Sequence, residues 1–292
     1  MTGSDIASDG PGVDGGAGAQ RLVDLVGIVN RTRDSFYDKG ATYQLDRAVA
    51  AVLRAEAEGA SWIDLGGVPF GPGAPVSLDE EINRVVPLIR EARRQTSMVI
   101  SVDTTNAPVA EAALEAGADY INDTSGLSDP AMAGVIARAS KGVVLVHSVS
   151  KPRVPVGHAE YRDVVSDVLD FLQVRVDRAL DAGIDAERIC VDPGHDLNKN
   201  TLHSLELTRR LEEFGVFGLP IFVAVSNKDF IGETLKAPID QRITGTAATL
   251  AVCVMKGASL VRVHNVAEAL QAVRMTEAIL GRWQPDGLRH NI

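Results

Sequence analysis

The sequence predicts a single-domain (β/α)8 TIM barrel, an α/β fold in which parallel strands alternate with helices. Two observations predict it. Short apolar runs alternate with longer amphipathic stretches from residue 24 onward, and eight such units can be counted. A polar residue or a glycine pair follows each apolar run directly, which is where barrel enzymes gather their functional groups.

The predicted strands are short and rich in Val, Ile and Leu, as strands buried on both faces are. In chain order they cover residues 25–29, 62–65, 98–102, 120–121, 143–146, 189–191, 221–225 and 259–263. The segments between them, for example residues 45–58 and 80–94, place apolar residues at helical spacing.

The residues that follow the strands differ in type but share that position. They are Asn30, Gly66 with Gly67, Asp103, Asn122 with Asp123, His147, Asp192, Ser226 with Lys228, and Arg262 with His264. A closed barrel brings all of them to one mouth, whereas an open sheet would scatter several. Asp103 and Asn122 also suit the N-caps of the next helices. The whole set favours a shared pocket, because caps do not require Lys, Arg or His.

Composition limits the partners and the location. The 292 residues carry a formal net charge of −10, which argues against a general affinity for nucleic acid or an anionic membrane. The sequence has neither an apolar run of roughly 18 residues nor a basic segment followed by an apolar one near its start. We therefore expect a cytoplasmic protein that is not bound to membranes or nucleic acid.

The domain organisation is simple. Residues 1–20 are mostly Gly, Ala, Ser and Asp, so we expect a disordered, flexible tail. The barrel is predicted for residues 21–284, with a C-terminal tail at 285–292. Cys190 and Cys253 lie inside apolar runs, which predicts two buried small side chains and no disulfide.

Seven motifs occur in order, nearly all of them at strand ends. They are Gly27-Ile-Val-Asn30 with Asp34-Ser-Phe36, Ile100-Ser-Val-Asp103-Thr104, Ile121-Asn122-Asp123, Asp192-Pro-Gly194, Ser226-Asn-Lys228, Gly245-Thr-Ala-Ala248 and Val261-Arg262-Val-His264. This succession, over about residues 25–280, resembles dihydropteroate synthase. The resemblance implies the barrel fold and the condensation of 6-hydroxymethyl-dihydropterin diphosphate with 4-aminobenzoate, which releases diphosphate.

A pterin has donors beside a carbonyl acceptor on one edge, so a specific pocket needs carboxylates and amides opposite a cation. The resemblance implies that Asp192 and Asn122 bind the aminopyrimidine edge and that Asp103 lies close by. It also implies that Lys228 reaches the carbonyl and a ring nitrogen, while Arg262 lies flat against the ring, as a planar guanidinium can.

Catalysis of this reaction is mostly the stabilisation of a leaving anion. Lys228, Arg262 and His264 are the predicted catalytic residues, with Arg262 and His264 facing the diphosphate. The resemblance further implies that Asn30 helps to hold Mg²⁺ on the phosphates, and that the protein is a homodimer through its last helices.

Several of these residues have a purely structural alternative. Asp192-Pro-Gly194 suits a simple turn, Lys228 a solvated helix surface, and Gly66 with Gly67 close packing. The remaining histidines are predicted to be surface or loop residues without a ligand role. They are His158, His195, His203 and His290.

The first two strand-to-helix loops depart from the family pattern. In place of Gly-Gly-Glu-Ser-Thr-Arg-Pro-Gly the second loop reads Gly66-Gly67-Val68-Pro69-Phe70-Gly71-Pro72-Gly73, which puts Phe70 and Gly71 in the altered part. The resemblance implies that the lost Arg and Thr face diphosphate and aminobenzoate. The first loop gains Arg31, Arg33 and Lys39, which either replace the lost cation, serve another anion or are solvated.

The acceptor side is also altered. The family's Ser-Arg-Lys-Ser becomes Ser226-Asn227-Lys228-Asp229, and the resemblance places the aminobenzoate carboxylate near this helix start. Asp229 is therefore expected either to cap the helix or to repel that carboxylate. Residues 195–199 replace a segment that is rich in Gly and Phe in the family, so an aromatic wall is expected to be missing.

The departures lie on the diphosphate and acceptor side, while the pterin side is kept. The hypothesis is therefore a dihydropteroate-synthase-like pterin-binding protein, similar to the diverged second copies of some bacteria, with weak or absent standard condensation. The alternative is a working synthase in which Arg31 and Arg33 compensate for the altered loop. A pterin-binding methyltransferase module and a non-catalytic pterin sensor also stay open.

Overall fold

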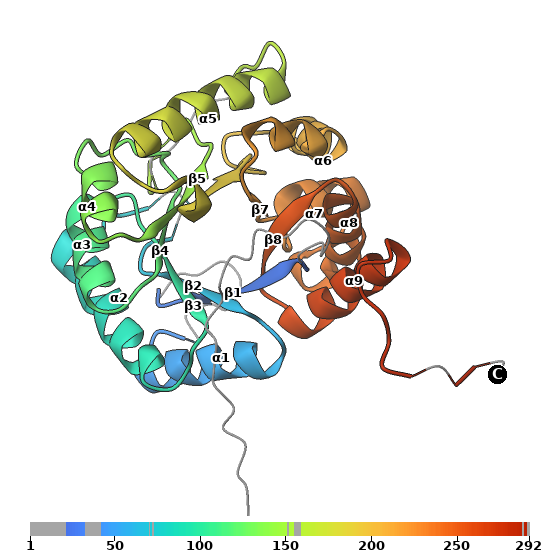
Figure 1. The fold of residues 1–292 in the computed structure, drawn as a ribbon, viewed down its shortest axis with the longest axis horizontal. Coiled ribbons are helices and arrows are strands. Elements are labelled where there is room, and N and C mark those ends of the chain that lie inside the picture. Colours follow the sequence, from blue (N-terminus) through green and yellow to red (C-terminus); the bar gives the residue numbers. More distant parts are fainter. Residues whose placement is uncertain are drawn as a thin grey trace, which may run out of the picture.

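The computed structural model describes residues 22–32, 42–69, 71, 73–150, 152–154, 159–287 and 289–290. Within these residues eight parallel strands pair in chain order, and the last pairs with the first, so the sheet closes (Figure 1). The strands are β1 (Asp24–Asn30), β2 (Trp62–Gly66), β3 (Val99–Asp103), β4 (Tyr120–Asp123), β5 (Gly142–Val146), β6 (Ile189–Asp192), β7 (Ile221–Val223) and β8 (Ala258–Val263). The predicted (β/α)8 barrel is confirmed.

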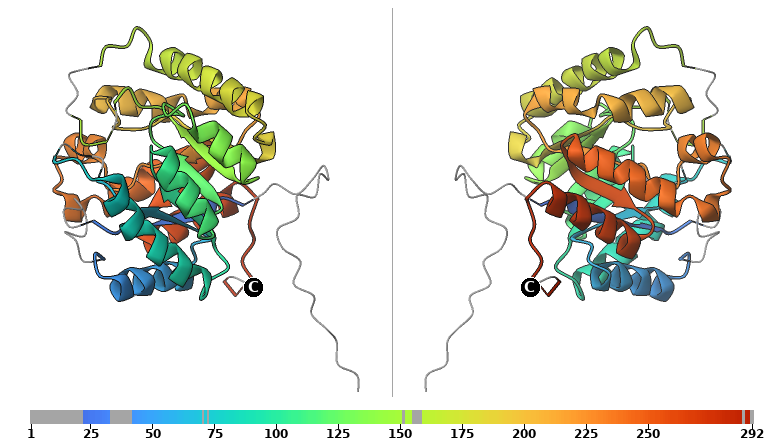
Figure 2. Two further views of the ribbon diagram at one scale, coloured as in Figure 1. Left: turned by 90° about the vertical axis from the view of Figure 1, so that its left-hand side faces the viewer. Right: turned by 90° about the vertical axis from the view of Figure 1, so that its right-hand side faces the viewer.

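Helices surround the sheet, and Figure 2 shows them from two sides. The α-helices are α1 (Leu45–Ala57), α2 (Leu78–Arg93), α3 (Ala107–Glu115), α4 (Met132–Arg138), α5 (Val164–Asp181), α6 (Thr201–Arg209), α7 (Asp229–Leu235), α8 (Ile243–Met255) and α9 (Val266–Ile279). Short 3-10 helices are η1 (Ala186–Arg188), η2 (Leu211–Phe217) and η3 (Ile239–Gln241). Both α7 and α8 lie between β7 and β8, so the described chain has one α-helix beyond the simple repeat.

The observed strands coincide with the predicted ones apart from their ends. The largest differences at one end are two residues: β4 ends at Asp123 rather than at residue 121, and β7 ends at Val223 rather than at residue 225. Its pairing with β8 shifts register between Ile221 and Phe222. Such an irregularity ends regular pairing early and lets the chain turn toward the barrel mouth.

The interior of the barrel is apolar below its mouth. Val26, Trp62, Phe222 and Leu260 are buried there in one cluster, and the rings of Trp62 and Tyr120 lie 4.5 Å apart. A second and larger apolar layer fills the space between the strands and the helices. The two layers fix the strand ends rigidly, so polar side chains at the mouth rest on a packed floor.

The remaining sequence predictions concern the two cysteines, membrane spans and the domain boundaries. Cys190 and Cys253 are buried and free, as predicted, and burial raises the pKa of the Cys253 thiol to about 12. Among the described residues, no helix has the length and apolarity that a membrane span needs. The predicted tail at residues 1–20 lies outside the described residues, and the domain boundaries stay a prediction.

Candidate functional site

A cavity of about 370 Å³ lies at the carboxyl ends of the strands. Five of its lining residues are the predicted pterin residues, which come from β3, β4, β6, β8 and the start of α7. They are Asp103, Asn122, Asp192, Lys228 and Arg262. Gly71 and Asp229, which belong to the altered loops, line the same cavity. The closed barrel therefore brings the predicted strand-end residues together, although Asp103 and Arg262 are 159 positions apart in the sequence.

Asp103 and Asn122 are not helix caps. The residue before α3 is Asn106 and the residue before α4 is Ala131, so the capping alternative is wrong for both. Asp103 and Asn122 instead lie opposite each other in the β3–β4 register and face the cavity.

A buried carboxylate that sequence reasoning missed organises the floor of this cavity. Asp64, in the middle of β2, accepts a 2.6 Å hydrogen bond from Nε of Arg262 and a 3.1 Å bond from Nδ2 of Asn122. Nη2 of Arg262 also lies 3.7 Å from Asp103. Burial lowers the pKa of Arg262, but the charges of Asp64 and Asp103 outweigh it and raise the pKa overall. The sequence did contain a signal for Asp64, because it is a lone carboxylate inside the otherwise apolar strand Trp62–Gly66.

The two cavity carboxylates on strand ends hold protons more tightly than usual. Burial, reinforced by the charge of Asp64, raises the pKa of Asp103 to about 7. Burial also raises the pKa of Asp192, against the opposing charge of Lys228 and a 2.7 Å hydrogen bond from the Gly194 amide. Ionised acceptors in such a site bind ligand donors strongly, because little water competes.

Lys228 and Asn122 add a cation and an amide to the carboxylates of the cavity. Lys228 donates to the carbonyl of His195, and burial lowers its pKa against the charges of Asp196 and Asp192. Oδ1 of Asn122 is buried and has no hydrogen-bond partner among the described residues. A buried polar atom in this condition costs free energy until a ligand satisfies it. The set offers carboxylates, an amide and two cations to one flat polar ligand.

The loop after β6 turns at a glycine and is braced by a lysine. Gly194 has φ +69°, and a Cβ there would lie 2.1 Å from the carbonyl oxygen of His147, so only glycine fits. Nζ of Lys199 binds the carbonyls of Gly194 and Leu197 at 2.9 and 3.0 Å, and Nδ1 of His147 at 2.8 Å. Asp192-Pro-Gly194 is thus a turn that also presents Asp192 to the cavity, so the two interpretations are compatible.

The two buried side chains beneath this loop, Lys199 and His147, both have lowered pKa values. Burial lowers the pKa of Lys199 well below its ordinary range. Burial and the charge of Lys199 lower the pKa of His147 to about 2. His147 therefore supports the loop as a neutral acceptor rather than lining the ligand cavity.

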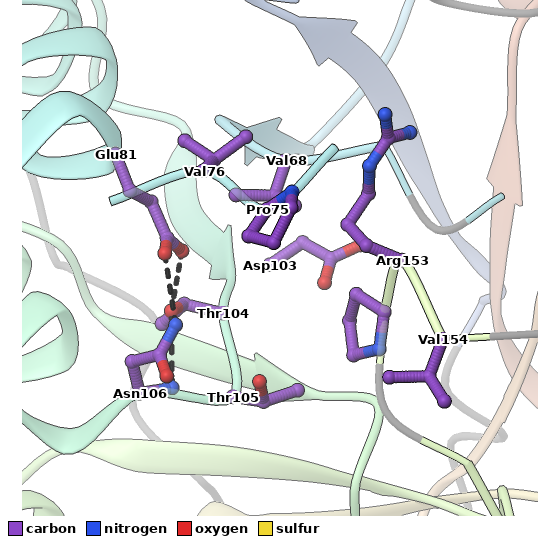
Figure 3. A pocket seen from close by; sticks show the side chains of 11 residues that line it. Val68, Pro75, Val76, Glu81, Asp103, Thr104, Thr105, Asn106, Arg153 and Val154 are labelled. Atoms are coloured by element: carbon purple, nitrogen blue, oxygen red, sulfur yellow. Dashed lines mark hydrogen bonds between the residues drawn. The ribbon is translucent and has the colours of Figure 1, made fainter. Parts of the chain in front are cut away.

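The second loop has room where the family has an arginine. A Cβ built on Gly71 would meet nothing within 4 Å. Arg153, from the loop after β5, donates to the carbonyls of Gly71 and Ala74 at 2.9 and 3.1 Å. Figure 3 shows Arg153 beside a second pocket of about 250 Å³, which Asp103 also lines. Phe70 lies outside the described residues.

Arg31 is placed differently from what a phosphate ligand needs. Its Nε donates to the Tyr43 carbonyl at 2.9 Å, and its Nη1 donates to the carbonyls of Asn83 and Arg84 at 3.2 and 2.9 Å. The guanidinium therefore braces the first loop against α2. Arg33 lies outside the described residues. Asn30 lies close to β2, because a Cβ on Gly66 would come within 2.5 Å of its Oδ1.

The acceptor-side residues form their own contacts. Oγ of Ser226 lies 3.2 Å from Nδ1 of His264 and accepts a 3.2 Å bond from the His264 amide. Asp229 is the first residue of α7, does not act as its N-cap, and pairs with Nη1 of Arg242 at 2.8 Å. Arg242 therefore screens the charge that was expected to repel a carboxylate.

The remaining histidines, predicted to be surface or loop residues, occupy different environments. His195 is a loop residue, but it is completely buried rather than at the surface, and its Nε2 lies 3.2 Å from Oγ1 of Thr208. Apolar packing against Phe230 explains its burial. His203 takes part in the capping box of α6, and His290 is exposed. His158 lies outside the described residues.

Comparison with known proteins gives one family. The family model described as pterin binding enzyme matches residues 26–264. "Inactive dihydropteroate synthase 2" of Mycobacterium leprae is 43% identical over 267 residues, which are 89% of this chain and 92% of that protein. "Dihydropteroate synthase" of Haemophilus influenzae is 38% identical over 255 residues, which are 87% of this chain and 93% of that protein.

Solved structures of dihydropteroate synthases are similar over almost the same length. The Yersinia pestis protein in complex with a sulfonamide drug has a TM-score of 0.86 at 35% identity, over 89% of this chain and 94% of that chain. The Xanthomonas albilineans protein has a TM-score of 0.82 at 37% identity with 4-aminobenzoic acid, over 89% and 93%. The same protein with 7,8-dihydropteroate has a TM-score of 0.79 at 35% identity, over 89% and 94%.

Proposed function

The chain belongs to the pterin binding enzyme family, and from this premise we propose how much of the family's reaction it retains. It is a dihydropteroate-synthase-like protein, and we propose that it keeps the pterin half of the site and carries out the standard condensation weakly or not at all. The observation that carries the proposal is the contrast within one cavity: five pterin-type residues surround it, while Gly71 stands where the family has an arginine.

In this proposal the pterin lies in the 370 Å³ cavity with its aminopyrimidine edge toward Asp192 and Asn122. The free Oδ1 of Asn122 accepts a ring N–H or amino hydrogen, and Lys228 donates to the carbonyl and a ring nitrogen. Arg262, fixed by Asp64, lies along the ring. Each polar group of the ligand then has a partner of opposite hydrogen-bonding type.

A leaving diphosphate finds less support. Arg262 and His264 face it in this proposal, with Asn30 as the one protein ligand of a phosphate-bound Mg²⁺. No cluster of three or more His, Cys, Asp or Glu that fits a metal occurs in the described ranges. One amide oxygen suits Mg²⁺ only when phosphates and water supply the other ligands. Arg31, one of the two compensating cations of the alternative proposal, already donates to backbone carbonyls.

Restoring the missing arginine tests this proposal. Gly71→Arg should tighten binding of pterin diphosphate by about tenfold or more, since a charge-assisted contact contributes about 1.5–3 kcal/mol. Pterin affinity should stay unchanged. Gly215→Arg is the matched control, because Gly215 lies outside the cavity lining and its Cβ position is also open. Calorimetry gives both affinities, and unchanged diphosphate binding in Gly71→Arg would contradict the proposal.

Pterin binding should depend on pH through Asp103. Because the pKa of Asp103 is raised to about 7, its ionised, accepting form grows through neutral pH. Affinity should rise by about tenfold from pH 6 to pH 8 if only this form binds. Asp103→Asn should flatten the profile, and an equally steep profile in that variant would exclude the role.

The same shift affects stability with a definite sign. The folded pKa of Asp103 lies above its ordinary 3.8, so the folded state binds the proton more tightly than the unfolded chain does. The contribution of Asp103 to stability is therefore fully present below about pH 4 and falls as pH rises toward 7.

We also propose a homodimer through α8 and α9, which pack against each other. Four large apolar side chains on these helices are exposed: Val252, Met255, Met275 and Ile279. Met275→Glu should shift the mass in light scattering from dimer to monomer at micromolar concentration, because it places a charge in an apolar contact. Leu202→Glu, at an exposed position on α6, is the control. A monomeric unmodified protein would contradict the dimer.

A cytoplasmic location stays a prediction of the sequence. It is supported by the net charge of −10 and by the acidic isoelectric point near 5.1, which suit a protein in free solution.

A further inference from the structure

More carboxylates than cations line the cavity. Four carboxylates line it, those of Asp103, Asp192, Asp196 and Asp229. Two cations oppose them, Lys228 and Arg262. Among the strand-end residues, Asn122 has an unpaired buried oxygen. Asp196 and Asp229 line the same cavity, together with Gly71 and Leu197.

Asp196 is fixed in place by its own contacts. Its backbone has φ +62°, a conformation that Asp and Asn tolerate better than most residues. Its amide donates to Oγ of Ser204 at 3.0 Å, and that hydroxyl donates back to Oδ1 at 3.0 Å. Its Oδ2 accepts a 3.2 Å hydrogen bond from the amide of Phe230, in the first turn of α7.

The start of α7 is therefore already occupied by an anion of the chain itself. The Phe230 amide is used by Asp196, and the amides of Ile231 and Gly232 donate to the Lys228 carbonyl at 3.2 Å each. Asp229 adds a second carboxylate beside them, although Arg242 holds it toward the exposed side. A ligand carboxylate arriving here meets like charge and finds these donors taken.

We propose that Asp196 is a specificity-determining residue, which makes the cavity beside the start of α7 reject a carboxylate-bearing acceptor and admit a neutral or cationic arylamine. The proposal rests on the proposed function, in which a pterin binds to the strand-end residues. It separates this chain from its relative in Xanthomonas albilineans, whose solved structure contains 4-aminobenzoic acid.

The test compares two acceptors that differ in one charge. Protein saturated with dihydropterin is titrated calorimetrically with 4-aminobenzoate and with 4-aminobenzamide, which keeps the ring and the amine but is neutral. The unmodified protein should bind the amide about tenfold more tightly than the acid, as expected for like charges in a partly buried site.

The variant Asp196→Asn removes the charge and keeps the shape, and asparagine already occupies a positive φ at Asn198 in the same loop. It should reduce the preference for the amide by about fivefold or more, through tighter binding of the acid. Asp240→Asn, an exposed carboxylate on η3 outside the cavity lining, should leave the preference unchanged.

Different failures have different meanings. If dihydropterin does not bind in the first step, the proposed function fails, and this proposal fails with it. If dihydropterin binds, three results overturn the proposal about Asp196 alone: the acid binds as tightly as the amide, Asp196→Asn keeps the original preference, or neither amine binds at millimolar concentration.

Discussion

Asp64→Ala is expected to lower the free energy of unfolding by about 3–5 kcal/mol, because it leaves the guanidinium of Arg262 in the barrel without its main counter-charge. Asp64 is fully buried, and its Oδ2 accepts hydrogen bonds from both Arg262 and Asn122. Denaturant unfolding followed by circular dichroism gives the change directly. The variant should also lose most of its pterin affinity, since both partners of Asp64 lie in the proposed pterin site.

A second substitution separates the lost charge pair from general damage. Asp64→Ala combined with Arg262→Leu should recover part of the lost stability, because the guanidinium that lost its main counter-charge is then absent. Asp181→Ala, at an exposed position at the end of α5, should change stability by less than about 0.5 kcal/mol. A loss below about 1 kcal/mol in Asp64→Ala would show that the pair does not organise the site.

Asp192→Ala is expected to reduce pterin affinity by about tenfold to a hundredfold, corresponding to about 1–3 kcal/mol for polar groups left unpaired. Asp192 is almost fully buried and faces the charge of Lys228, so its loss removes an acceptor for the ligand and a counter-charge for the lysine. Calorimetric titration with dihydropterin measures the effect.

The control for this variant must show that the loop after β6 is intact. Lys199 braces that loop through the carbonyls of Gly194 and Leu197, and Asp192→Ala leaves these contacts in place. The unfolding transition should therefore stay cooperative. Unchanged pterin affinity in a folded Asp192→Ala protein would exclude the proposed pocket.

The sequence was sufficient to predict the fold and the convergence of the strand-end residues on one cavity. Each strand is a short apolar run with a polar residue behind it, and a closed barrel has a single mouth, so Asp103, Asn122, Asp192 and Arg262 had to meet. The detailed geometry of barrel closure was not needed for this prediction. The position of a residue relative to the end of its strand determines whether its side chain converges on the mouth.

Contacts across the barrel could not be predicted in the same way. Asp64 and Arg262 are 198 residues apart, and their hydrogen bond depends on the tilt of β2 and β8 and on rotamers. The direction of Arg31 depends on three carbonyls of residues 43, 83 and 84, which periodicity does not position. The sequence shows that a charged residue lies in a loop, but its hydrogen-bond partner depends on how that loop packs.

The side-chain contacts at the start of α7 could not be predicted from the sequence either. The sequence drew attention to Asp229, which lies at the start of α7, yet the structure pairs it with Arg242. Asp196 lies 33 residues earlier and becomes a neighbour of α7 only because the loop after β6 folds over it. Backbone conformation at positive φ decides where such a side chain points, and composition gives little indication of it.

We propose that the site keeps its affinity for the pterin ring and has lost most of its affinity for the diphosphate. This proposal is tested most directly by calorimetric titration of the unmodified protein with the pterin, its monophosphate and its diphosphate, each with and without Mg²⁺. The three ligands should bind within about threefold of one another, because Gly71 supplies no cation to the phosphates. Diphosphate binding about a hundredfold tighter than pterin binding in the presence of Mg²⁺ would contradict this proposal and favour a working synthase.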